Sequence, residues 1–171
     1  DSFSLHKNIH PYIIGRIYAC KLIYNHCFGD QKLIPELIEE FKFKTANLPI
    51  HENHFRDFPA AHYIFAEALF LTKQYQSCIS VVEVALSKFP IRTEFIRKGY
   101  YRQMQIFWYL SKYKLGDHKI NNRFLFKINP ENYYFISNRH FSIYFYWAKF
   151  LYNQNFEYFN KAKKLAILNK N

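Results

Sequence analysis

The sequence predicts an all-α protein, built as an antiparallel array of about seven or eight helices joined by short turns. Apolar residues recur with the 3.6-residue period of an α-helix along most of the chain. The 171 residues include only four Gly and six Pro, too few for the many turns of a β-sandwich or barrel. Half of the residues are apolar, which provides a core and excludes disorder as the main state.

The first helix is predicted to begin at Pro11 and to end at Gly29, a residue type that commonly terminates helices. The second is predicted over 33–45, where Pro35 is tolerated in the first turn. The stretch 47–57 has the composition of a loop. Helical spacing within the first helix predicts one core-facing stripe, formed by Ile14, Ile17, Tyr18, Cys20, Tyr24 and Cys27.

The rest of the chain divides into six further predicted helices, over 59–72, 76–88, 93–115, 119–127, 132–152 and 155–168. Residues that end or interrupt helices mark the breaks between them: Pro90, Gly116, Pro130 and the turn Asn153-Gln154-Asn155. We expect these helices to form a single domain over 1–171. The chain has no initiator Met, and we expect it to be part of a larger protein.

The segment from Pro59 to Pro90 carries the pattern of a helix–turn–helix repeat. Ala66 lies midway along its first helix, and Tyr75 stands at the turn. The second helix carries the small residues Cys78 and Ala85. This pattern resembles the tetratricopeptide repeat, in which small residues stand where the two helices cross closely. His62 and Leu69 depart from that family, which often has Trp and Tyr at these positions.

The resemblance implies an α–α superhelix that acts as a non-enzymatic scaffold and binds a protein or peptide. In that family the first helices of successive pairs line a concave groove. The positions that would face the groove here are Tyr63, Glu67 and Phe70. In the alternative interpretation, Tyr63 and Phe70 pack against the preceding helix pair.

The net positive charge of the chain comes entirely from its second half. Residues 1–90 hold nine Lys or Arg and nine Asp or Glu, whereas residues 91–171 hold fifteen and four. A basic stripe is predicted on the fifth helix and beyond it, formed by Lys98, Arg102, Lys112, Lys119 and Arg123. It suggests an alternative function, a nucleic-acid-associated protein or the helical regulatory domain of a transcription regulator. A solvated helix face is the other interpretation.

The sequence carries no recognisable catalytic motif, neither GxSxG nor a glycine-rich phosphate loop, so we expect no enzyme activity and no cofactor. Glu36, Glu39 and Glu40 are spaced to form the solvated face of a helix. The strongest metal candidate is formed by His51, Glu52, His54 and Asp57, but surface or capping roles are the preferred interpretation of these residues. No metal site is therefore expected.

Three cysteines without CxxC spacing, and no signal peptide at the start, favour a reducing compartment and a cytoplasmic location. Cys20 and Cys27 are expected to pack in the core. No apolar run is long enough to cross a membrane. The last helix ends in an apolar edge, Leu165, Ile167 and Leu168, which either covers a core or docks a second copy or another domain.

Overall fold

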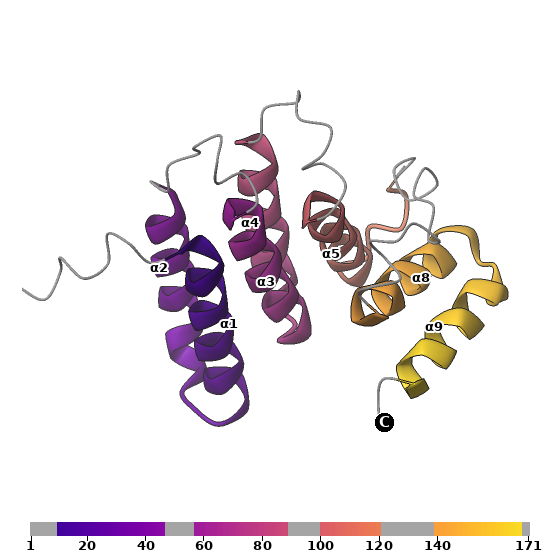
Figure 1. Cartoon of the computed structure of the whole chain (residues 1–171), viewed down its shortest axis with the longest axis horizontal. Helices are drawn as coiled ribbons and strands as arrows, with labels where there is room; N and C mark the ends of the chain where they lie inside the picture. The colour runs from indigo at the N-terminus through magenta and orange to yellow at the C-terminus, as the bar shows by residue number, and fades with distance from the viewer. Residues whose placement is uncertain (1–9, 47–56, 89–99, 121–138, 169–171) are drawn as a thin grey trace, which may run out of the picture. The chain divides into compact units, whose positions relative to one another are not determined.

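The computed structural model describes residues 10–46, 57–88, 100–120 and 139–168 (Figure 1). Within these ranges the chain forms seven α-helices and one short 3-10 helix without any strand, which confirms the predicted all-α class. Contacts between residues divide the chain into two compact units, Asp1–Met104 and Gln105–Asn171. No helix of the described ranges has the length and apolar character of a membrane span.

Helix α1 spans Pro11–Cys27, and the His10 imidazole caps it by accepting a hydrogen bond from the Tyr12 N–H at 3.4 Å. The predicted end was correct to within two residues, although Gly29 does not adopt the left-handed conformation of a glycine cap. The buried residues of α1 are Gly15, Tyr18, Ala19 and Leu22. The predicted core-facing stripe was therefore wrong in all but Tyr18 and the half-buried Ile14.

The buried face of α1 is determined by its small residues. The largest helix–helix contact in the first unit joins α1 to α3, which spans Asp57–Leu71. A Cβ atom on Gly15 would lie 2.6 Å from both the Cα and the carbonyl oxygen of Ala61. The backbones approach so closely because neither residue has a side chain that would separate the helices.

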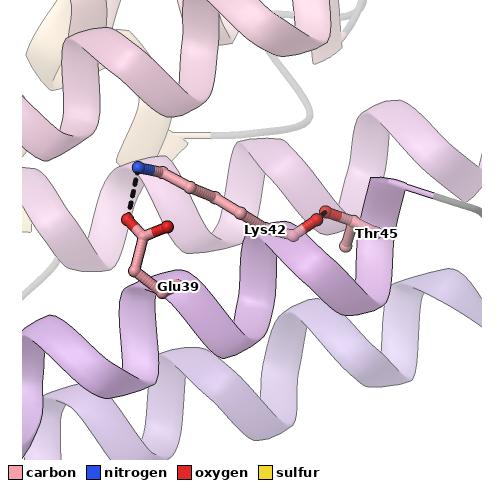
Figure 2. Close-up of polar contacts among 3 residues, drawn as sticks. All are labelled: Glu39, Lys42 and Thr45. Carbon is pink, nitrogen blue, oxygen red and sulfur yellow. Dashed lines mark hydrogen bonds and ion pairs between the residues drawn. The ribbon is translucent and has the colours of Figure 1, made fainter.

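Helix α2 spans Ile34–Ala46 and follows a 3-10 turn, Gln31–Leu33, which Asp30 caps by accepting a hydrogen bond from the Lys32 N–H at 2.9 Å. The predicted solvated face is confirmed, since Glu36, Glu39 and Glu40 are all exposed. In Figure 2 the Lys42 ammonium reaches back to the Glu39 carboxylate at 2.7 Å, and the Thr45 hydroxyl donates to the Lys42 carbonyl at 3.3 Å.

Helices α3 and α4 form a hairpin in which α4 spans Tyr75–Ser87. Ala66 and Cys78 meet where the helices cross, and the Cys78 thiol donates to the Ala66 carbonyl at 3.4 Å. Both residues are fully buried, as is Ala85 further along α4. The turn between the helices places Lys73 in the left-handed region, with φ of 62°.

An aromatic cluster fills the core between α1, α2 and α3. The Phe41 ring of α2 stacks on Phe65 of α3 with a centroid distance of 4.0 Å. Tyr18 of α1 approaches Phe41 edge-on at 5.6 Å, and the buried His62 approaches the same ring at 5.3 Å. His62 is thus a core residue.

The second unit contains α5 from Gln105 onward, α8 and α9. Helix α5 spans Tyr100–Lys114, α8 spans Arg139–Asn153 and α9 spans Phe156–Leu168. Helices α8 and α9 share a large contact, and the turn between them lies at the predicted position. Its Asn155 side chain caps α9 by accepting a hydrogen bond from the Glu157 N–H at 2.9 Å.

Several sequence predictions fall partly or wholly outside the described residues. They are the loop 47–56, the start of the fifth helix at 93–99, the short helix from residue 121 onward and the start of the next helix at 132–138. Within the described part of α5, Met104 is buried. Leu115 lies beyond the end of α5 and is exposed.

Candidate functional site

The residues predicted to face a groove lie on α3 and are largely covered. Tyr63 retains 8% and Phe70 6% of the exposure of a free residue, and only Glu67 is partly exposed. The Phe70 ring contacts Tyr75 of α4 at 5.6 Å. Tyr63 and Phe70 therefore offer a ligand little surface of their own.

The predicted basic stripe is only partly described, because Lys98 and Arg123 lie outside the described residues. Arg102 and Lys112 are half-buried, and burial lowers the pKa of the Arg102 guanidinium. The Lys112 ammonium lies 4.7 Å from the centre of the Trp108 ring, and Lys119 is exposed. Tyr109, which helical spacing places on the same side of α5 as Arg102 and Lys112, is buried, so this side of α5 is not a fully solvated face.

An exposed apolar stripe runs along α1 on the side away from its buried residues. We call it the α1 stripe, and it consists of Ile13, Ile17, Cys20, Tyr24 and Cys27. The exposed fractions of Ile13, Ile17 and Tyr24 are 49%, 41% and 60%. Successive members lie four, three, four and three residues apart, which is the spacing of a helix–helix seam.

The borders of the α1 stripe are positively charged. Arg16 and Lys21 are exposed beside it, and α1 contains no Asp or Glu. The Arg16 guanidinium donates to the Tyr12 hydroxyl at 2.9 Å, and the Lys21 ammonium lies 5.3 Å from the centre of the Tyr18 ring. Both cations are thus held on the helix that carries the stripe.

A second exposed surface combines aromatic and basic residues on α9. We call it the α9 face, and it consists of Phe156, Phe159, Lys163 and Lys164. The exposed fractions of Phe156 and Phe159 are 67% and 42%. Each ring contacts Phe150 of α8 with a centroid distance of 5.3 Å, so α8 supports both rings from one side.

Where α8 meets α9, lysine side chains lie against tyrosine rings. Tyr146 and Tyr158 stack at 6.3 Å with nearly parallel rings, and the Lys149 ammonium lies 4.7 Å from the centre of the Tyr158 ring. The Lys161 ammonium pairs with the Glu157 carboxylate at 2.7 Å, and this hydrogen bond lowers the pKa of Glu157. The one carboxylate of α9 is therefore neutralised by a neighbour on the same helix.

The predicted metal candidates His51, Glu52 and His54 lie outside the described residues, and no side-chain position is described for Asp57. Among the residues that the structure describes, no three His, Cys, Asp or Glu side chains are grouped to hold a metal ion. None of the three cysteines, Cys20, Cys27 and Cys78, forms a disulfide bond. The prediction that Cys20 and Cys27 pack in the core was wrong, because both are exposed and only Cys78 is buried.

The sequence contained a signal for the α1 stripe but not for the α9 face. The spacing of the α1 stripe is visible in the sequence, but such spacing is equally typical of a core-facing helix. The rings of the α9 face were missed because Lys163 interrupts the apolar spacing on that side of the helix.

Comparison with known proteins gives no family to which the chain can be assigned. No family model matches it, and neither the curated proteins nor the solved structures include a match.

Proposed function

We propose that this chain is a non-enzymatic helical scaffold that binds a protein partner, and that the α1 stripe is the docking surface. The observation that carries the proposal is the exposure of Ile13, Ile17 and Tyr24 along one side of a helix whose opposite side is already buried. A helix that is apolar on both sides normally has both sides covered. Contiguous exposed apolar surface of this kind marks interaction sites.

The occupant we propose is an apolar helix of a partner protein, with carboxylates beside its own seam. The spacing of the α1 stripe matches a second helix that packs alongside it. Arg16 and Lys21 would repel the same residues of a second copy, whereas they would attract Asp or Glu of a partner. Charge complementarity therefore favours an acidic partner helix over self-association.

The tetratricopeptide-like arrangement and the cytoplasmic location remain part of this proposal. The close crossing of α3 and α4 at Ala66 and Cys78 is compatible with a repeat of that family. The free, exposed thiols of Cys20 and Cys27 are compatible with a reducing compartment. On this view the partner binds to the outer side of α1 and not to Tyr63, Glu67 and Phe70.

Two synthetic helical peptides test the proposal. Both carry Leu at the seam positions, and they differ only in having Glu or Lys at the flanking positions. Fluorescence anisotropy should show the Glu peptide binding at least about tenfold more tightly than the Lys peptide, because only Glu complements Arg16 and Lys21. Equal affinity for the two peptides would overturn the charge argument.

Substitutions then locate the binding surface. Ile17→Glu should abolish binding of the Glu peptide, because it places a carboxylate in the middle of the seam. Phe43→Glu is the matched control, since Phe43 of α2 is 71% exposed and lies outside the α1 stripe. Binding that survives Ile17→Glu would contradict the proposed surface. Sedimentation could instead show that the parent chain is a dimer and that Ile17→Glu makes it a monomer. The occupant of the α1 stripe would then be a second copy of this chain and not a partner helix.

A further inference from the structure

The α9 face has the chemistry of a surface that binds unpaired bases. Phe156 and Phe159 are exposed, while Phe150 supports their rings from α8. Exposed aromatic rings stack on unpaired bases, whose faces a duplex hides. We propose that the α9 face binds single-stranded nucleic acid, a function separate from partner binding by the α1 stripe.

The charge around the α9 face fits a polyanion. Lys163 and Lys164 are exposed on α9, and Glu157, its one carboxylate, is already paired with Lys161 at 2.7 Å. A phosphate backbone that follows α9 would therefore meet these two cations and no unpaired carboxylate on that helix.

The position of Lys163 favours nucleic acid over a lipid surface. Phe156, Phe159, Lys163 and Ile167 follow one another at intervals of three, four and four residues, so they lie along one side of α9. A helix that enters a bilayer keeps its cations at the border of the apolar side. Here the ammonium stands between the rings and Ile167, where insertion would bury it. Beside stacked bases, the same ammonium can contact the phosphate.

Fluorescence anisotropy with labelled oligothymidine, oligouridine and a DNA duplex of equal length tests the proposal. We expect the single strands to bind at least about tenfold more tightly than the duplex, because only unpaired bases can stack on Phe156 and Phe159. Equal binding to the duplex, or tighter binding to polyglutamate or to anionic vesicles, would overturn it.

Two sets of variants separate stacking from charge. Phe156→Ala and Phe159→Ala should each weaken single-strand binding by between about 5- and 150-fold and leave its salt dependence unchanged. The double variant Lys163→Gln, Lys164→Gln should reduce the salt slope by about 1.4, because each lost phosphate contact removes about 0.7. If the lysine variant loses affinity by the same factor at every salt concentration, so that its salt slope is unchanged, Lys163 and Lys164 do not contact phosphates directly.

Matched controls come from the first unit. Phe43→Ala removes a ring that is 71% exposed, and Lys32→Gln removes an exposed ammonium, and neither should change binding. Binding of the Glu peptide should be unaffected by Phe156→Ala. Failure of one proposal is thereby distinguishable from failure of the other.

Discussion

At the scale of single residues, the contact between Gly15 and Ala61 sets how closely α1 and α3 pack. Ala in place of Gly inside a helix normally raises the free energy of unfolding by about 0.5–1 kcal/mol. Here the added methyl group would lie 2.6 Å from backbone atoms of Ala61, which cannot rotate away. The sign of the effect should therefore reverse.

We predict that Gly15→Ala lowers the free energy of unfolding by about 1–3 kcal/mol, as expected for overpacking. Urea denaturation monitored by circular dichroism measures this change. Gly29→Ala is the control, because the atom 2.6 Å from its added methyl group is the Asn25 side-chain oxygen, which can move, and the nearest backbone atom is further away, at 3.1 Å. A Gly15→Ala protein as stable as the parent would show that α1 and α3 do not approach as described.

Buried tyrosines make the stability sensitive to high pH. Burial raises the pKa of Tyr18, and its hydrogen bond to the Glu40 carboxylate at 2.7 Å raises it further. Burial also raises the pKa of Tyr109 to about 12, with smaller contributions from Tyr113 and Tyr152. In the unfolded chain these tyrosines have a pKa of about 10. As the pH rises, the unfolded chain therefore loses its tyrosine protons before the folded chain does.

The free energy of unfolding should thus be insensitive to these groups below pH about 10 and should fall as the pH rises above it. We predict that Tyr18→Phe costs about 1 kcal/mol at pH about 8, through the lost hydrogen bond, and makes the alkaline decline shallower. Urea denaturation across this pH range measures both effects. Tyr24→Phe removes the hydroxyl of an exposed ring and is the matched control. If the free energy of unfolding falls equally steeply with pH in the parent and in Tyr18→Phe, the prediction is contradicted.

At the scale of elements, two helix–helix turns contain a non-glycine residue with positive φ, Lys73 at 62° and Gln154 at 56°. Most side chains are strained in this conformation and glycine is not. We predict that Lys73→Gly raises the free energy of unfolding by up to about 1 kcal/mol and that Lys73→Val lowers it by about as much. Urea denaturation measures both, and a glycine variant less stable than the valine variant would show that the turn has another conformation.

The positions of the helices could be predicted from the sequence, but the sides that they bury could not. The fourth helix was expected at 76–88 and spans Tyr75–Ser87, because prolines and polar turns are local signals. Which side of α1 faces the core depends on its neighbour. Apolar residues occur on both sides, and the short side chains of Gly15 and Ala61 determine which side can approach α3.

At the scale of the whole molecule, the sequence identified the kinds of residue available for binding better than their location. The excess positive charge of residues 91–171 is a property of composition, and it needs no structure to be recognised. The basic stripe on α5 could not be recognised in the same way, since Arg102 and Lys112 are half-buried and the Lys112 ammonium lies against the Trp108 ring. The α9 face depends on the support of Phe150, a contact between helices that spacing within α9 cannot predict.

Because Cys20 and Cys27 are exposed on α1, the reactivity of their thiols reports whether this helix is covered. Seven residues of helix separate the two thiols by about 10 Å, too far for a disulfide between them, so both stay available to a reagent. Ellman's reagent should titrate two thiols in the native protein and the third, Cys78, only after denaturant is added. Three equally fast thiols would contradict this arrangement. Any partner that covers α1 would slow two reactions at once, while Cys78 serves as an internal reference for folding.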